Sequence, residues 1–277
     1  MKLSEACLSQ VNKGILDAIF RRAFERLHTA DMSYMFTRYL YEQVKQGTPV
    51  PKDHPIRRVI FPTLYNGFLV DTQISAGSGN ITMMREVDRE IKTNFRSIGQ
   101  QFIVSAWATL ESLLDDFCVF WLMHFPDLFR GLKLNKGISI EIEVLLFPAS
   151  HKYEIAQKLV DHIKGAYPNM TSMVRFEKFM QQAGFTDFSL TKNVTTGLTE
   201  LENARHITVH NDGRIDSIFK KRCPDPKANP ENINDFYQIT LDRRQNFFDQ
   251  IIELTRTITA QVRSSCPKIV NGPWEGP

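Results

Sequence analysis

Hydrophobic residues recur every three or four positions over most of this chain, which is the spacing of helices with one buried face. The strongest such run starts near residue 82 or 95 and ends before Pro126, because proline cannot continue a helix. Its positions on one face are Phe102, Ala106, Leu110, Leu113, Phe117 and Trp121. We therefore expect a long central helix with a strongly apolar side.

Similar patterns predict helices before and after this central one. The first covers about residues 4 to 46 and ends at Gly47-Thr48-Pro49, with apolar positions at Leu8, Val11, Ile15, Ile19, Ala23, Leu27, Met35, Tyr39 and Leu40. The later ones cover about residues 151–166, 171–183, 195–209 and 241–263. The last has Phe248, Ile251, Leu254, Ile258 and Val262 along one side. Gly184 and the run Asn211-Asp212-Gly213 are stop signals for the helices before them.

Three segments lack this periodicity. Residues 49–80 hold four prolines and short β-prone pieces, which predicts loops or a small hairpin. Residues 138–146 are compatible with a short strand, and residues 220–235 predict a surface loop. The fold class expected from the whole pattern is all-α, that is, predominantly helical.

Composition and charge leave the function open. The chain has 277 residues, of which 42% are hydrophobic and 23% are charged, as in ordinary soluble domains. A net charge of +3 is too balanced to require a nucleic-acid partner, although local clusters matter more than the total. The candidate basic patches are Arg21-Arg22, Arg57-Arg58, Lys220-Lys221-Arg222 and Arg243-Arg244, and each could equally be a solvated helix face.

Cysteine usage and hydropathy favour a cytoplasmic protein. The four cysteines, Cys7, Cys118, Cys223 and Cys266, show no paired metal-ligand spacing, and Cys118 is expected to be a core thiol. The most apolar window, 102–125, carries three carboxylates, which argues against a membrane span. The first ten residues lack the apolar stretch of a signal peptide.

The helix predicted over residues 195–209 gathers residues suited to chemistry. Its apolar stripe, Val194, Leu198, Leu201 and Ala204, is expected to face the core. Glu202, His206 and His210 follow one another at four-residue spacing on a neighbouring stripe. Arg205 lies three residues from Glu202, so that their side chains can meet. A carboxylate, a guanidinium and two imidazoles are thus expected near the carboxyl end of one helix.

Arg205 and His210 are nevertheless about 140° apart around an ideal helix. They would therefore not converge on one phosphate from a single unbroken helix. Two arrangements would bring them together. The stop signal after His210 indicates that the helix unwinds there, which could re-aim this side chain. Alternatively, a second copy of the chain across a dimer axis could complete the site.

The run from Glu202 to His206, followed by Val209-His210-Asn211-Asp212-Gly213, resembles the hallmark of HEPN (higher eukaryotes and prokaryotes nucleotide-binding) domains. That hallmark is an arginine and a histidine separated by four to six residues in all, of which the first is usually polar. Here four residues separate Arg205 from His210, and His206 fills the polar position. The helix around Trp107 to Asp115 resembles the first helix of the family, and Tyr237 to Leu241 with the helix after it resembles the usual ending.

The resemblance covers roughly residues 91–265 and implies a HEPN-like up-and-down helical bundle over that range. Residues 1–90 would then be an N-terminal helical or irregular extension, and residues 266–277 a C-terminal tail. Family members with this motif typically act as homodimers. The resemblance therefore also implies a homodimer with the site at its interface.

The resemblance further implies a metal-independent endoribonuclease that needs no cofactor. The ribose 2′-OH would attack its own 3′ phosphate and leave a 2′,3′-cyclic phosphate and a 5′-OH. His210 would be the acid-base residue and Arg205 the phosphate stabiliser, because imidazole exchanges protons near neutral pH and guanidinium binds phosphate oxygens bidentately. Glu202, His206 and Asn211 would support them or contact RNA. By analogy, the role would be that of a toxin or antiviral effector, with a regulatory or antitoxin protein as a partner.

Several other interpretations remain open at this point. Arg205 and Glu202 could form a plain helix salt bridge, with His210 as a helix cap. His206 and His210 could bind zinc, although the residue after His206 is not the glutamate of protease helices. The whole chain could be a non-catalytic HEPN module that binds nucleotide, RNA or protein, or a scaffold whose N-terminal region carries the function. Trp107 and Trp121 are expected in the core rather than as base-stacking platforms.

Overall fold

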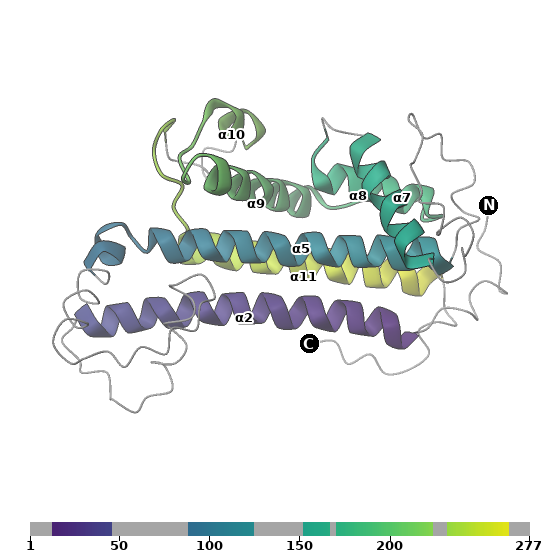
Figure 1. Ribbon diagram of the computed structural model, residues 1–277, viewed down its shortest axis with the longest axis horizontal. Helices are drawn as coiled ribbons and strands as arrows, with labels where there is room; N and C mark the ends of the chain where they lie inside the picture. Colours follow the sequence, from purple (N-terminus) through teal and green to yellow (C-terminus); the bar gives the residue numbers. More distant parts are fainter. Residues whose placement is uncertain (1–12, 46–87, 125–151, 167–169, 224–231, 266–277) are drawn as a thin grey trace.

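The structure is a computed structural model that describes residues 13–45, 88–124, 152–166, 170–223 and 232–265 (Figure 1). These residues form seven named helices: α2 (Lys13–Lys45), α5 (Arg96–His124), α7 (Lys152–Ala166), α8 (Ser172–Gln182), α9 (Lys192–His210), α10 (Ser217–Arg222) and α11 (Leu241–Ser265). Within the described ranges the only β pairing is an isolated bridge between Arg214 and Phe236. The all-α prediction is confirmed. The hairpin predicted in residues 49–80, the strand at 138–146 and the Arg57-Arg58 patch lie outside the described residues.

The four long helices alternate in direction along the chain (Figure 1). Arg26 and Tyr34 of α2 contact Ser112 and Phe102 of α5, which shows that these two helices are antiparallel. The same kind of cross-contact, Gln100 of α5 with Asp212 just after α9, makes α9 antiparallel to α5. Helix α11 runs against α9 in turn, because Gly197 lies beside Gln250 and Glu200 beside Arg243. The result is an up-and-down arrangement with α5 between α2 and α9.

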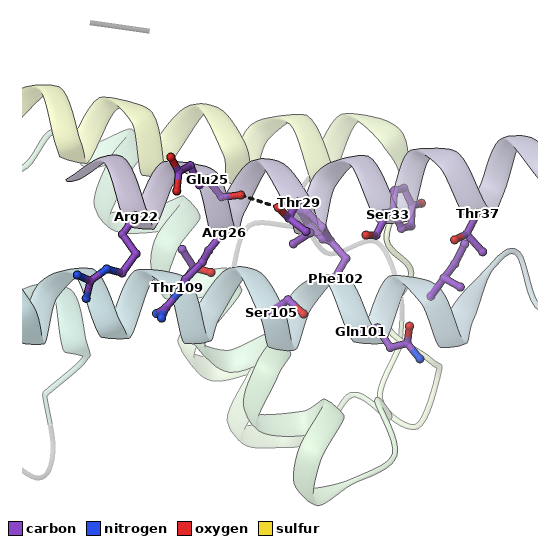
Figure 2. A pocket seen from close by; sticks show the side chains of 13 residues that line it. Arg22, Glu25, Arg26, Thr29, Ser33, Thr37, Gln101, Phe102, Ser105 and Thr109 are labelled. Carbon is purple, nitrogen blue, oxygen red and sulfur yellow. Dashed lines mark hydrogen bonds between the residues drawn. The ribbon is translucent and has the colours of Figure 1, made fainter. Parts of the chain in front are cut away.

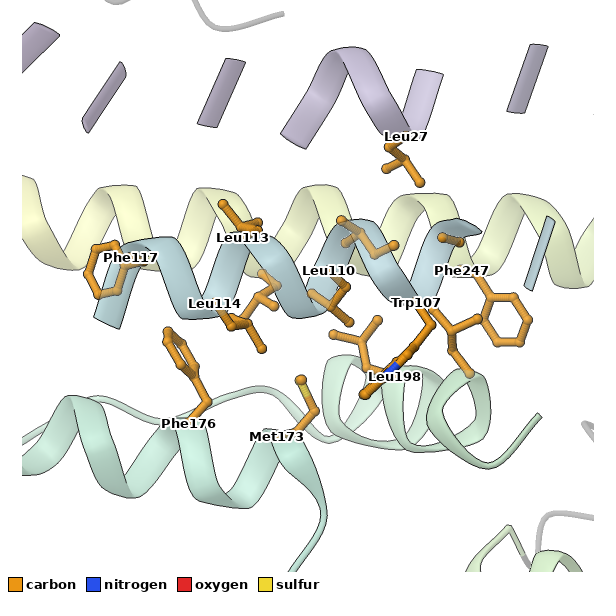
Figure 3. Packing of buried hydrophobic residues seen from close by; sticks show 14 of the residues in the cluster. Leu27, Trp107, Leu110, Leu113, Leu114, Phe117, Met173, Phe176, Leu198 and Phe247 are labelled. Atoms are coloured by element: carbon orange, nitrogen blue, oxygen red, sulfur yellow. The ribbon is translucent and has the colours of Figure 1, made fainter. Parts of the chain in front are cut away.

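Helix α5 is the centre of one continuous hydrophobic core (Figure 3). Its predicted inward positions are all buried: Phe102, Ala106, Leu110, Leu113, Phe117 and Trp121. They meet Leu27 of α2, Met173 and Phe176 of α8, Leu198 of α9 and Phe247 of α11. Helix α2 comes from the segment that the sequence separates from the HEPN-like part, yet its side chains share this core. Trp107 and Cys118 are also buried in it, as predicted, and burial raises the pKa of the Cys118 thiol well above its usual value.

The buried face of α2 differs from the apolar pattern in its second half. Residues at seven-residue spacing, Phe20, Leu27, Tyr34 and Tyr41, are buried. Met35 and Tyr39 are exposed. The reason is that two tyrosines take the inward positions, and the Tyr34 hydroxyl finds a partner there by donating to the Ile239 carbonyl at 3.2 Å. A count of aliphatic residues alone does not detect such a face.

Helix α2 is also joined to α11 by an ion pair between Asp31 and Arg244, whose side chains are mostly buried. Removing one partner of such a pair would leave the other charge poorly solvated. The Asp31–Arg244 pair therefore holds α2 against α11. Within the described residues, no helix combines the length and apolarity that a membrane crossing needs.

The structure confirms the stop signals predicted after α8 and α9 and adds N-caps that the sequence analysis did not name. Thr171 and Thr191 are the N-caps of α8 and α9, since each hydroxyl accepts a hydrogen bond from the backbone N–H three residues on. Gly184 has φ of 95° after α8, as expected of a residue that stops a helix. The loop predicted over residues 220–235 is wrong at its start, because Lys220 to Arg222 belong to α10. Asp216 caps this short helix by accepting from Phe219 N at 2.7 Å.

Candidate functional site

The last two turns of α9 present Arg205, His206 and His210. The predicted core stripe of this helix, Val194, Leu198, Leu201 and Ala204, is buried, which turns the opposite side outward. His206 and His210 are exposed, and their ring centroids are 4.7 Å apart. Arg205 is half-buried. The three side chains named by the sequence motif therefore lie at one accessible helix end.

The turn after His210 does not re-aim this histidine. His210 is the last residue of α9, and Asn211 N still donates to the Ile207 carbonyl at 2.8 Å. Asn211 is the C-cap, with φ of −138°, and Asp212 and Gly213 after it have φ angles of 50° and 73°. An unbroken helix keeps Arg205 and His210 about 140° apart. Of the two arrangements considered for bringing them together, unwinding at His210 is thus not what the structure has.

Asn211, predicted as a supporting residue, holds the turn itself. Its side-chain amide Nδ2 donates to the Arg214 carbonyl at 2.7 Å. Gly213 N closes the helix end by donating to the Ile207 carbonyl at 2.9 Å. Gln100 Nε2 of α5 donates to the Asp212 carbonyl at 3.1 Å. The end of α9 is thereby fixed to the start of α5.

Glu202 does not meet Arg205, contrary to what the helical spacing allowed. Its carboxylate turns to α8, where it accepts from Ser172 N at 3.1 Å and from Ser172 Oγ at 2.8 Å. Arg175 Nη2 lies 3.9 Å from the same carboxylate. A carboxylate at the first turn of a helix is favoured by the unpaired N–H groups and the helix dipole. Glu202 therefore joins α9 to α8.

Arg205 stands out among the arginines of the described region. Six arginines whose side chains are described there are buried or half-buried. Five of them have partners: Arg38 with Glu42, Arg175 with Ser172, Arg243 with Glu200, Arg244 with Asp31, and Arg96 with the Phe236 ring. Among the described residues Arg205 makes no hydrogen bond, ion pair or ring contact. The plain salt bridge with Glu202, one of the open interpretations, is therefore not formed.

The acidic residues of α5 take no part in this cluster. Asp115 accepts a hydrogen bond from Lys164 Nζ of α7 at 2.6 Å, beside a cavity of about 160 Å³ that Ser172 and Arg175 also line. Burial raises the pKa of the Asp115 carboxyl, against the lowering effect of Lys164. In the part of the chain that the structure describes, no three His, Cys, Asp or Glu residues are grouped as a metal site.

A buried polar network beneath α9 escaped the sequence analysis. Glu200 is only 4% exposed and accepts a hydrogen bond from the Tyr237 hydroxyl at 2.6 Å. Arg243 Nε lies 3.7 Å from the same carboxylate. The sequence contained one signal for this network. Glu200 directly precedes Leu201 of the core stripe, and a carboxylate that is buried there needs a partner. Arg243 thus pairs with Glu200 and Arg244 with Asp31, so these two arginines do not form a basic surface patch.

The basic end of α10 packs against α9 near Asn203. Lys221 and Arg222 are exposed, and Arg222 Nη1 donates to Oδ1 of buried Asn203 at 3.3 Å. Asn203 lies one turn before His206 on α9. The predicted patch at 220–222 is therefore attached to α9 through Arg222, one turn before His206.

A separate groove of about 700 Å³ lies between α2 and α5, on the side of α5 away from α9 (Figure 2). Short hydroxyl side chains line it, namely Thr29, Ser33, Thr37, Ser105 and Thr109, with Arg22 and Arg26 towards one end. Arg26 Nη1 already donates to Ser112 Oγ at 3.2 Å. The groove shares no residue with the α9 cluster.

No protein-family model, curated protein or solved structure matches this chain. The case for a function therefore rests on the residues and their geometry.

Proposed function

We propose that this protein is a metal-independent endoribonuclease of the HEPN type that acts as a homodimer. The observation that supports the proposal most is the state of the Arg205 side chain. A half-buried guanidinium that makes no hydrogen bond, ion pair or ring contact with other described residues keeps its donors available for an anion, and its planar fork matches the oxygens of a phosphate. His206 and His210 are exposed at the same helix end, so a group that can bind phosphate and groups that can transfer a proton belong to the last two turns of α9.

The chemistry needs few groups. A histidine removes the proton from the ribose 2′-OH and returns one to the leaving 5′ oxygen. The oxygen attacks the adjacent phosphorus, the bond to the 5′ oxygen breaks, and a 2′,3′-cyclic phosphate and a 5′-OH remain. Arg205 stabilises the negative charge that builds up on the phosphorane oxygens. His210 is assigned the proton transfer, and His206 supports it.

The helix geometry supports the proposal of a second copy of the chain. Arg205 and His210 diverge on one unbroken α9, so both reach one phosphate only when two helix ends face each other. Val209 lies between His206 and His210 in the sequence and is 50% exposed, which leaves an aliphatic contact for such a meeting.

The test is cleavage of a single-stranded RNA by the purified protein in EDTA. We expect products with cyclic-phosphate ends, and we expect the Arg205→Ala and His210→Ala exchanges each to lower the rate by about 100-fold or more. Matched controls are Arg21→Ala and His28→Ala on α2, which remove an exposed arginine and an exposed histidine far from α9. These should cleave like the wild type.

Two outcomes would contradict the proposal in different ways. If Arg205→Ala and His210→Ala cleave as fast as the controls, the site is assigned wrongly. If the wild type binds RNA in a saturable, salt-sensitive manner but never cleaves it, the chain is a non-catalytic binding module instead.

A further inference from the structure

The turn after α9 carries positive charge that the proposed chemistry does not use. The guanidinium carbon of Arg96 lies 3.9 Å from the centroid of the Phe236 ring, and that of Arg214 lies 4.0 Å from the same centroid. We call these three residues the Arg–Phe–Arg stack. The two cations are no more than about 8 Å apart, a distance at which like charges repel.

Three parts of the chain build this stack and hold it still. Arg96 is the first residue of α5, and Gln100, one turn later, hydrogen-bonds to the turn after α9. Backbone hydrogen bonds join the turn to the segment that leads into α11, from Tyr237 N to the Gly213 carbonyl and from Ile215 N to the Asp235 carbonyl. The stack therefore has a fixed position relative to His210, which precedes Arg214 by four residues.

A neighbouring pair shows what a structural arginine looks like here. Arg243 lies over the Tyr237 ring at 4.6 Å, and the Glu200 carboxylate balances its charge. Among the described residues neither Arg96 nor Arg214 forms an ion pair. Of the aspartates in these loops, Asp216 and Asp235 accept backbone N–H groups and Asp212 lies exposed on the turn. The charge of the stack is thus left without a carboxylate partner.

The donors of the stack are also largely unused. Arg214 is exposed and gives one N–H to the Asn234 carbonyl at 3.2 Å, although a guanidinium has five. The ring beneath holds the planar group in one orientation, which lowers the entropy lost when the group binds an anion. Two oriented guanidinium groups without carboxylate partners suit a ligand that carries several phosphates in a row better than a ligand with a single carboxylate.

We propose that the Arg–Phe–Arg stack binds the phosphodiester backbone of single-stranded RNA next to the phosphate held by Arg205 and His210. This rests on the proposed function and extends the substrate surface beyond the scissile bond. Backbone contacts position a nucleic acid without reading its sequence. Binding through the stack should therefore be sensitive to salt and tolerant of sequence.

The experiment measures binding separately from cleavage. A fluorescein-labelled 2′-O-methyl RNA lacks the attacking hydroxyl, so its anisotropy reports the affinity of the full-length protein without turnover. We expect Arg96→Gln and Arg214→Gln each to raise Kd about fivefold, and the slope of log Kd against log salt to fall by about 0.7 for each lost contact. The control is the double exchange Arg21→Gln, Arg22→Gln on α2, which removes the same charge and should stay within about twofold of wild type.

The lysine variants separate charge from packing. Arg96→Lys with Arg214→Lys keeps both charges but loses the stacked planar donors, so its affinity should fall between that of the wild type and that of the variant with both arginines changed to glutamine. If it loses as much affinity as the double glutamine variant, which combines Arg96→Gln with Arg214→Gln, the arginines serve the fold and the inference is wrong. A double glutamine variant that binds like the α2 control also overturns it, as does a wild type that binds no RNA. If binding depends on the stack but no RNA is ever cleaved, the stack stands and the ribonuclease activity fails.

Discussion

Gly213 is the residue on which the end of α9 depends most directly. Its φ of 73° lies in the left-handed region, and it is buried against α5. A Cβ built there would lie 2.4 Å from Gln100 Nε2, the atom that donates to the Asp212 carbonyl. Any other residue must therefore bear backbone strain and push away the side chain that fixes the turn.

We predict that Gly213→Ala lowers the free energy of unfolding by about 1–2 kcal/mol, from the left-handed backbone and one weakened hydrogen bond. Urea unfolding followed by circular dichroism measures it. The matched control is Gly165→Ala near the end of α7, where an added Cβ meets nothing within 4 Å. That exchange should leave the stability unchanged or raise it by up to about 1 kcal/mol, because alanine favours a helix. Equal losses in both variants would show that the turn is not strained.

At the scale of elements, the contact between α8 and α9 decides how Glu202 is understood. The resemblance makes it a helper of Arg205, whereas its carboxylate accepts two hydrogen bonds from Ser172 at the start of α8. The buried network of Glu200, Tyr237 and Arg243 holds the other side of α9 to the segment before α11. Helix α9 is thus fixed on two sides by carboxylates that do not face the proposed site.

We predict that Glu202→Ala costs about 1–2 kcal/mol of stability, because it removes an acceptor from a helix start. It should leave the cleavage rate of the folded protein well above that of Arg205→Ala. Glu253→Ala on the exposed side of α11 is the control and should change the stability by less than about 0.5 kcal/mol. A Glu202→Ala protein with unchanged stability and no cleavage would instead mean that Glu202 acts on RNA.

At the scale of the whole molecule, the positions of Arg205 and His210 decide whether one chain or two chains supply the proposed site. All four long helices share one core, and within it α9 keeps Arg205 and His210 on diverging sides. Within the described part of one chain, bringing the two side chains to the same side would require breaking this helix.

We predict that mixing the inactive Arg205→Ala and His210→Ala proteins restores cleavage. If one copy gives the arginine and the other the histidine, a mixed dimer keeps one complete site. Equal amounts should then recover up to about a quarter of the wild-type rate after subunit exchange. Light scattering verifies that dimers form, and adding either variant to wild type provides the control. A mixture that stays inactive although mixed dimers are present would place each site within a single chain.

Much of this protein could be predicted from its sequence because helices depend on local spacing. The period of apolar residues located α5, α7, α8, α9 and α11 within a few residues, and Gly184 and Asn211 to Gly213 marked real helix ends. The core stripe of α9 was also correct. These features depend on neighbours one turn away along the chain, so the order of residues contains them.

Contacts between distant segments were decided only by the tertiary structure. The inward tyrosines of α2, the pairing of Glu202 with Ser172, and the meeting of Arg96, Arg214 and Phe236 join residues far apart in the sequence. A charged side chain can pair within its helix or across to another one, and packing chooses between them. For that reason the sequence located the residues of the candidate site at one helix end, while the fold determined which of them remain available to a substrate.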